Sequence, residues 1–174
     1  MTNETLNVLR ERRSIRSYRA EQIKPEELDA ILEAGIWAPS AKGLQDAVMV
    51  VVQDAGTISR LSALNAGVMG KPGADPFYGA PTCVVVLGDS RQGNWVQDGS
   101  LVLGNLMIAA KSLGIGSCWI NRALEVFDRP EGRELLKEWG LPDYYRGVGH
   151  CVLGYAAGDA PAPKPRKNGS IVRV

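Results

Sequence analysis

The sequence predicts a single domain of the mixed α/β or α+β class that spans residues 1–174. Two apolar runs rich in β-branched residues, at 47–52 and 82–87, have the composition of buried strands. They alternate irregularly with segments of helical apolar spacing, an order typical of such a mixed domain. A chain of 174 residues is long enough for one sizeable hydrophobic core.

Composition and charge exclude several classes of protein. Hydrophobic residues make up 45% of the chain and charged residues 22%, as in an ordinary globular protein. The net charge of +1 argues against duplex nucleic acid as a partner, and no apolar run approaches the ~20 residues of a membrane span. The three cysteines lie far apart, which disfavours a disulfide framework or a zinc site and suits the reducing cytoplasm. The one histidine, His150, leaves little for a metal centre, so we predict no metal site.

The chain begins with two expected helices. Residues 3–12 have apolar positions on one side only. A second helix starts at Lys24, where a proline and two acidic residues suit the first turn. It runs into the segment before Pro39, because a proline disfavours helix in the residue that precedes it.

The next segments alternate between expected strands and helices. The run 47–52 is predicted to be a strand buried on both faces, and 57–64 has the apolar spacing of a helix. Residues 65–81 are rich in glycine and proline and predict a long loop, which in a compact domain tends to be functional or mobile. A second buried strand follows at 82–87.

The second half contains an unusually apolar helix. Residues 96–113 are apolar nearly all round, so this helix is expected to be buried on every side, either centrally or against a second subunit. A glycine turn then leads into a third strand within 114–120. A helix over 128–139 and a strand over 148–153 follow, and residues 171–174 are a candidate edge strand.

Cations gather at two ends of the sequence. Segment 12–16 holds three arginines and Ser14, which indicates either a solvated basic face or an oxyanion site. Lys164 and Arg166 alternate along the proline-rich arm of residues 160–174, so both side chains of an extended chain point the same way and offer a second wall for one anion. The loop at 40–42 would add donors between the two walls.

Several motifs, in this order, give the chain a recognisable resemblance. They are RRSIRSY at 12–18, AGIWAPSAKGLQ at 34–45, GAPTCVVVLGD at 79–89, the stretch from Asp98 to Ile120 containing GNLMIAAKSLGIGSCWI, and GHCVLGY followed by PKPRK near the end. Together they resemble the FMN-dependent nitroreductase family, and its compact members most closely. The resemblance covers nearly the whole chain.

The resemblance implies a fold, an assembly and an activity. The fold is α+β and nitroreductase-like, with a central mixed β-sheet flanked by helices, and the assembly is an intertwined homodimer with FMN at the subunit interface. The implied activity is reduction of small electron-poor acceptors, such as nitroaromatics or quinones, with NADH or NADPH as reductant. Hydride would pass through flavin N5 in a ping-pong reaction, so we name no protein side chain as general acid or base.

The resemblance also implies which residues bind the cofactor. Arg12, Arg13 and Ser14 would meet the ribityl and phosphate end, Lys164 and Arg166 the same phosphate, and Arg16 the N1–C2=O edge, where reduction leaves negative charge. The remaining cofactor-binding residues are Pro39, Ser40, Ala41 and Gln45 of a loop from the other subunit, Asn65 at the interface, and Trp119 and Ile120 on a strand beside the ring.

Departures from the family pattern keep a second function open. Asn121 stands where larger nitroreductases often carry a glutamate, and Asp46 follows Gln45 where many relatives have Pro-Trp. No helical insertion is evident between Asp89 and Asp98 to close over a substrate. The alternative is therefore a flavoprotein of the same fold with a dedicated non-nitro substrate, in reductive dehalogenation or flavin modification.

Overall fold

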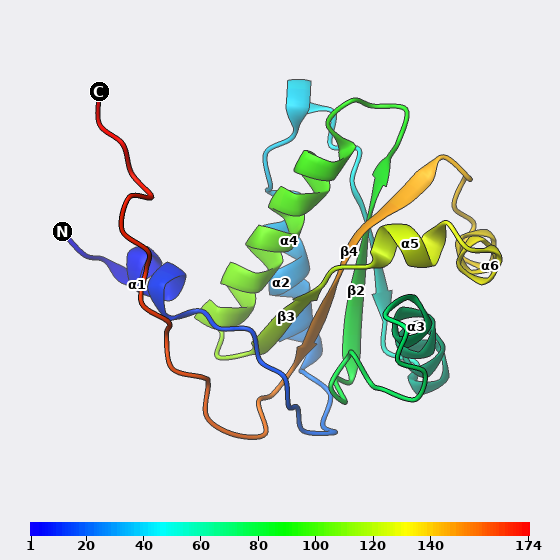
Figure 1. Ribbon diagram of the computed structural model, residues 1–174, viewed down its shortest axis with the longest axis horizontal. Helices are drawn as coiled ribbons and strands as arrows, with labels where there is room; N and C mark the ends of the chain where they lie inside the picture. Colours follow the sequence, from blue (N-terminus) through cyan, green and yellow to red (C-terminus); the bar gives the residue numbers. More distant parts are fainter.

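The computed structural model describes residues 1–174 and contains one four-stranded sheet with helices on both faces (Figure 1). The helices are α1 (Glu4–Glu11), α2 (Pro25–Ile36), α3 (Ala55–Val68), α4 (Trp95–Ser112), α5 (Ala123–Phe127) and α6 (Pro130–Glu138), with a short 3₁₀ helix η1 (Ala41–Gly43). The strands are β1 (Val48–Val52), β2 (Thr82–Asp89), β3 (Gly116–Ile120) and β4 (Tyr145–Gly154). None of the helices combines the length and apolar character that crossing a bilayer requires.

The sheet has the strand order β1-β2-β4-β3, and each pair of neighbours is antiparallel. The predicted α+β fold is confirmed, with antiparallel rather than mixed pairing among the four strands. Parallel pairing occurs in a single isolated bridge, between Ser14 and Ser117. The chain before α2 therefore runs along the outer edge of β3, and this edge is where the arginine stretch lies.

Two hydrophobic clusters fill the two faces of the sheet. On one face α2 and α4 pack through residues such as Ile31 and Leu103, and on the other α3, α5 and α6 pack through Leu61 and Phe127. Because helices cover both faces, β2 is buried along its whole length, as its composition predicts. Strand β1 differs from the prediction: it lies at the sheet edge, and Val51 is 39% exposed.

Helix α4 is not buried on every side within one chain. Val102, Leu103 and Leu106 pack into the core, but Val96 and Leu101 are each 45% exposed. Apolar side chains of the helix therefore face outward at two places. Of the two expected arrangements, complete burial within one chain is therefore wrong, and burial against a second subunit stays a prediction.

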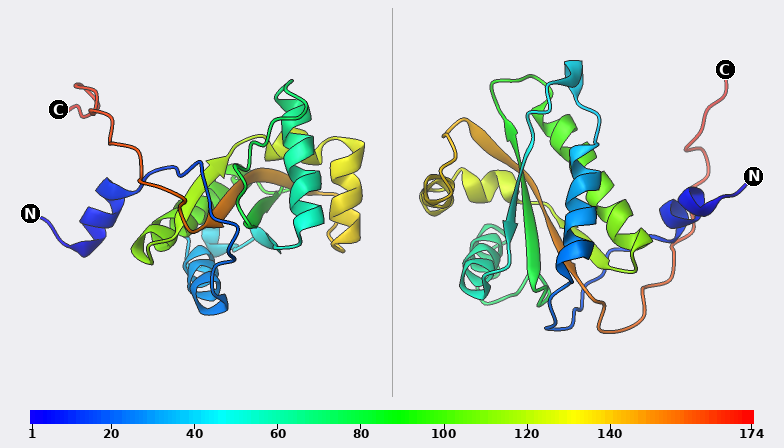
Figure 2. Two further views of the ribbon diagram at one scale, coloured as in Figure 1. Left: turned by 90° about the horizontal axis from the view of Figure 1, so that it is seen from below. Right: turned by 180° about the vertical axis from the view of Figure 1, so that it is seen from behind.

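The C-terminal arm has no strand. Ile171 and Val172 are 78% and 81% exposed, so the edge strand expected over 171–174 does not form within the chain. The arm leaves the end of β4 and returns toward the side of the molecule where α1 lies, which brings both termini to one side (Figure 2).

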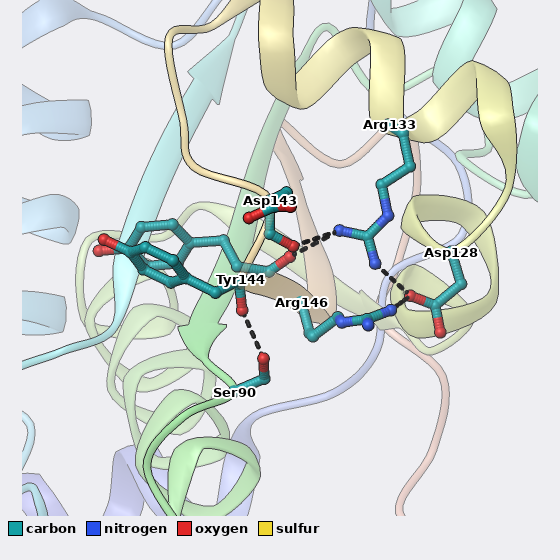
Figure 3. Close-up of polar contacts among 7 residues, drawn as sticks. Ser90, Asp128, Arg133, Asp143, Tyr144 and Arg146 are labelled. Atoms are coloured by element: carbon teal, nitrogen blue, oxygen red, sulfur yellow. Dashed lines mark hydrogen bonds and ion pairs between the residues drawn. The ribbon is translucent and has the colours of Figure 1, made fainter.

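Helix α5 is not among the elements that the sequence predicts, and a polar cluster holds it to its neighbours (Figure 3). The Asp128 carboxylate, directly after α5, accepts hydrogen bonds from Arg133 of α6, at 2.8 Å, and from Arg146 of β4. Arg133 also donates to the backbone carbonyl of Asp143 at 2.7 Å. The hydroxyl of Ser90 donates to the backbone carbonyl of Tyr144 at 2.6 Å. These contacts fix the end of the sheet at which β4 begins.

The buried His150 makes stability sensitive to acid. Its ring lies 5.4 and 5.9 Å from those of Phe77 and Phe127, and burial lowers the pKa of His150 from 6.5 to about 4. The imidazole of His150 binds a proton more readily in the unfolded chain than in the folded one. The contribution of the neutral ring to stability is therefore complete above about pH 6.5 and is lost as the pH falls toward 4. We expect His150 to lower the free energy of unfolding by about 1.4 kcal/mol per pH unit within this window.

Urea titrations at pH 7 and pH 5 measure this effect. The His150→Gln variant has no titrating ring and serves as the control, since the other acid-sensitive groups are unchanged. Its stability is expected to fall less between the two pH values than that of the unsubstituted protein. Equal falls in the two proteins would contradict the assignment.

Candidate functional site

The arginine stretch is fixed between the outer edge of β3 and the start of the C-terminal arm. The amide of Ile15 donates to the carbonyl of Ser117 at 3.0 Å, which ties the stretch to β3. The amide of Ala157 donates to the carbonyl of Ser17 at 3.1 Å, which ties the segment just before the arm to the stretch. The backbone on both sides of Arg16 is therefore held in place.

Two hollows border this segment. The larger, of about 360 Å³, lies between Ser14–Ser17 and residues 157–161, where the chain passes into the arm. The smaller, of about 130 Å³, is lined by Arg12, Arg13 and Lys111. Lys111, near the C-terminal end of α4, forms an ion pair with Glu11 at 3.5 Å. Sequence reasoning missed this lysine, because only the packing of α1 on α4 brings it there.

Arg12 supplies the clearest sign of a missing partner. Its Nη1 atom is buried and has no hydrogen-bond acceptor. An unsatisfied buried donor on a charged group costs about 1–3 kcal/mol or more. Arg12 also lines the smaller hollow, so an anion bound there would meet its guanidinium group. The site therefore favours an oxyanion ligand over the solvated-face interpretation.

Arg13 is largely committed to the fold. Its Nη1 donates to the carbonyl of Arg10 at 2.9 Å and to the carbonyl of the preceding residue, Arg12, where α1 ends. A cation in this position satisfies free carbonyls at the C-terminus of the helix. Its remaining donors still lie at the smaller hollow, so Arg13 adds positive charge there.

Lys164 and Arg166 do not meet the arginine stretch within one chain. The Nε and Nη2 atoms of Arg166 donate to the carbonyl of Lys164 at 3.2 and 2.8 Å, and both residues are exposed. The wall opposite Ser14 is formed by residues 157–161 instead. The expected second wall of cations is therefore absent from the single chain.

The loop from Pro39 to Gln45 lies at the opposite end of α4 from α1, the helix that Arg12 directly follows (Figure 1). The amide of Ala41 donates to the Asp98 carboxylate in the first turns of the helix, whereas Lys111 marks its far end. Thirteen residues of α-helix separate these two positions, which is about 20 Å. The interpretation that the loop lies between the two groups of cations is wrong within one chain.

Three other expected site residues point mainly into the protein. Asn65 is fully buried in α3, where its Nδ2 donates to the carbonyl of Leu61 at 3.0 Å and its Oδ1 has no partner. Ile120 is 4% exposed and belongs to the core. The indole of Trp119 lies against Gly149, and its Nε1 is buried without an acceptor. Of the three, only Trp119 keeps a partly exposed side chain.

Cys118 lies close enough to Arg12 and Arg16 to feel their charge. Burial raises the pKa of Cys118, although Arg16 and Arg12 nearby act in the opposite direction. At neutral pH the group therefore stays a thiol rather than the reactive thiolate. Cys118 is 2% exposed and belongs to the hydrophobic core.

Comparisons with known proteins give a consistent result. A model of the nitroreductase family matches residues 9–155. A solved nitroreductase with bound FMN from Bacteroides fragilis is 34% identical, with a TM-score of 0.92 over 99% of this chain and 100% of that one. Another with bound FMN, from Desulfitobacterium hafniense, is 29% identical, with a TM-score of 0.89 over 100% of both chains. An FMN reductase (NAD(P)H) of Bacillus subtilis is 31% identical over 94% of this chain and 70% of its own length.

Proposed function

Because the chain belongs to the nitroreductase family, we propose that it is an oxidoreductase that binds FMN and takes electrons from NADH or NADPH. Its acceptors would be nitroaromatics, quinones or similar electron-poor small molecules. The observation that carries the proposal is the buried, unpartnered Nη1 of Arg12, a residue that lines the smaller of the two hollows. When bound, FMN would supply the redox chemistry by accepting and passing on a hydride at N5.

The residues of the arginine stretch fit the two ends of this cofactor. Arg12 and Ser14 would hold the phosphate, because a guanidinium N–H and a hydroxyl donate well to phosphate oxygens. Arg13 would add charge beside them. Arg16, exposed at the larger hollow, would lie at the N1–C2=O edge of the ring and stabilise the negative charge that reduction leaves there.

We further propose that two chains share each site as a homodimer. The exposed apolar side chains of α4 and the exposed Trp37, at 78%, leave apolar surface that a second copy would cover. The loop from Pro39 to Gln45 would then reach the flavin held by the arginines of the other chain. The arm would bring Lys164 and Arg166 to a phosphate that they do not meet in their own chain.

A cytoplasmic location is part of the proposal. Cys83, Cys118 and Cys151 are all free and buried. Unpaired thiols suit a reducing compartment, which also supplies NADH and NADPH.

Spectra and kinetics test the proposal directly. The purified protein is expected to show the visible absorption of bound oxidised flavin. Steady-state rates measured at several concentrations of NADH and of a nitroaromatic acceptor should give parallel double-reciprocal lines, because reductant and acceptor use one site in turn. A colourless protein that fails to bind added FMN would overturn the proposal, and intersecting lines would exclude the shared site.

A specific observation also favours a dedicated acceptor. The connection between β2 and α4 is only the short segment 90–94, so it contains no helical insertion that could close over a substrate. The similarity to an FMN reductase makes free flavin one candidate, beside halogenated aromatics. Turnover of NADH with free flavin or haloaromatics, but with none of a nitroaromatic panel, would favour this second function.

A further inference from the structure

We infer that Asp98 is a positioning residue of the active site, acting through the loop from Pro39 to Gln45. The inference rests on the proposed function, since it concerns how that loop would be presented to the flavin of a second chain. Asp98 itself would touch neither flavin nor substrate. Its role would be to hold the loop backbone in one shape.

The loop is a tightly specified structure. The hydroxyl oxygen of Ser40 accepts the amide of Gln45 at 2.9 Å, and the amides of Gly43 and Leu44 donate to the carbonyls of Ser40 and Ala41 at 3.0 and 3.2 Å. These bonds close the turn from Ser40 to Gln45 upon itself. Such a turn keeps its place only if its start is also fixed to the rest of the protein.

The loop also stores backbone strain. Lys42 and Gln45 have φ values of 56° and 53°, in the left-handed region that side chains other than glycine rarely adopt. Each such residue costs of the order of 1–3 kcal/mol and persists only when its surroundings impose it. Strained backbone of this kind is concentrated at ligand-binding segments, which links the loop to the site rather than to the core.

Asp98 provides the anchor. It is 4% exposed, and both carboxylate oxygens lie 3.1 Å from the amide nitrogen of Ala41. A hollow of about 210 Å³ adjoins this contact, between the loop and α2, and Ser40, Gln45 and Asp98 all line it. Pro39 and residues 42–45 are exposed, so the carboxylate is the one side-chain hydrogen bond that ties the loop to α4.

A simpler role for Asp98 must be distinguished. An acidic side chain in the first turns of α4 is stabilised by the positive end of the helix dipole, and Asn94 provides no side-chain cap there. In that role the negative charge matters and the Ala41 contact does not. The Asp98→Asn substitution would remove the charge and keep an acceptor oxygen, whereas Asp98→Ala removes both.

Hydrogen–deuterium exchange of the holoenzyme tests the anchor. Asp98→Ala is expected to speed exchange of the amides of Ala41 and Gln45 about tenfold or more, because their hydrogen bonds open together. Asp98→Asn should keep most of the protection. Amides of β2 serve as the internal control and should not change. Unchanged exchange at Ala41 in Asp98→Ala, or equal loss in both variants, would overturn the inference.

Kinetics and spectra connect the anchor to the site. Displacing the loop by about 1 Å is expected to lower kcat/KM for NADH by up to about 100-fold in Asp98→Ala, with FMN still bound and its visible bands shifted. Asp98→Asn should restore most of this loss. Normal kinetics in Asp98→Ala despite faster exchange would show a structural role only and refute the positioning role. Absence of flavin from the unsubstituted protein would instead refute the proposed function, and the exchange data would still show whether Asp98 holds the loop.

Discussion

Arg12→Ala is expected to raise the Kd for FMN by about 10- to 100-fold, because it removes a charge-assisted hydrogen bond worth about 1.5–3 kcal/mol. Arg16→Ala should leave FMN bound and slow its reduction by about 100-fold, because the ring would lose a fixed cation where negative charge develops. The two arginines are four residues apart, yet the structure gives them different surroundings. Arg12 has a buried donor without an acceptor, whereas Arg16 is exposed at a hollow.

Two measurements separate these effects. Titration of the apoprotein with FMN, followed by flavin fluorescence, gives the Kd, and anaerobic stopped-flow absorbance gives the rate of reduction by NADH. Arg10→Ala is the matched control, since it removes the same charge from an exposed position outside both hollows. Equal loss of FMN from the Arg12 and Arg16 variants would contradict this division of roles.

The sequence predicts those elements whose identity depends on local pattern. The run 82–87 is buried on both faces as its β-branched composition indicates, and the apolar spacing of 96–113 corresponds closely to α4. Strand β1 has a similar composition but lies at an edge, because the strand order depends on contacts made across the whole chain. Local pattern cannot distinguish a central strand from an edge strand when both are apolar.

In the candidate site, too, the features set by local sequence are predictable and those set by contacts across the chain are not. The arginines of segment 12–16 are adjacent in sequence, so their grouping is visible without a structure. The anchoring of Ala41 by Asp98 joins residues 57 positions apart, and Lys111 reaches Arg12 only through the packing of α1 on α4. Asn65, by contrast, is a residue that the sequence places at the site and the structure does not. Its glycine-rich context suggests a loop residue, but α3 continues through it and turns its side chain inward.

Chains carrying different defects are expected to complement one another if each site is shared. Lys42→Pro should disrupt the loop, because proline holds φ near −65° and Lys42 requires 56°. Arg12→Ala disables the cofactor end of the same site. In a hybrid dimer of the two variants, one site combines both defects and the other combines the intact Arg12 of one chain with the intact loop of its partner. The hybrid should therefore have about half the activity of the unsubstituted dimer, while each variant alone has little.

Co-expression with two different affinity tags isolates the hybrids. NADH-dependent turnover measures them at an FMN concentration that fills the unsubstituted site but not a site that carries the Arg12→Ala defect. A hybrid of Arg12→Ala with Arg16→Ala is the matched control: both residues belong to the same half of the site, so neither site in that dimer is intact. Restoration in the first hybrid and not in the second would follow directly from the separation of about 20 Å along α4 between the loop and the arginines. If neither hybrid regained activity, each chain would have to hold a complete site, and the loop would have no role at the flavin of its partner.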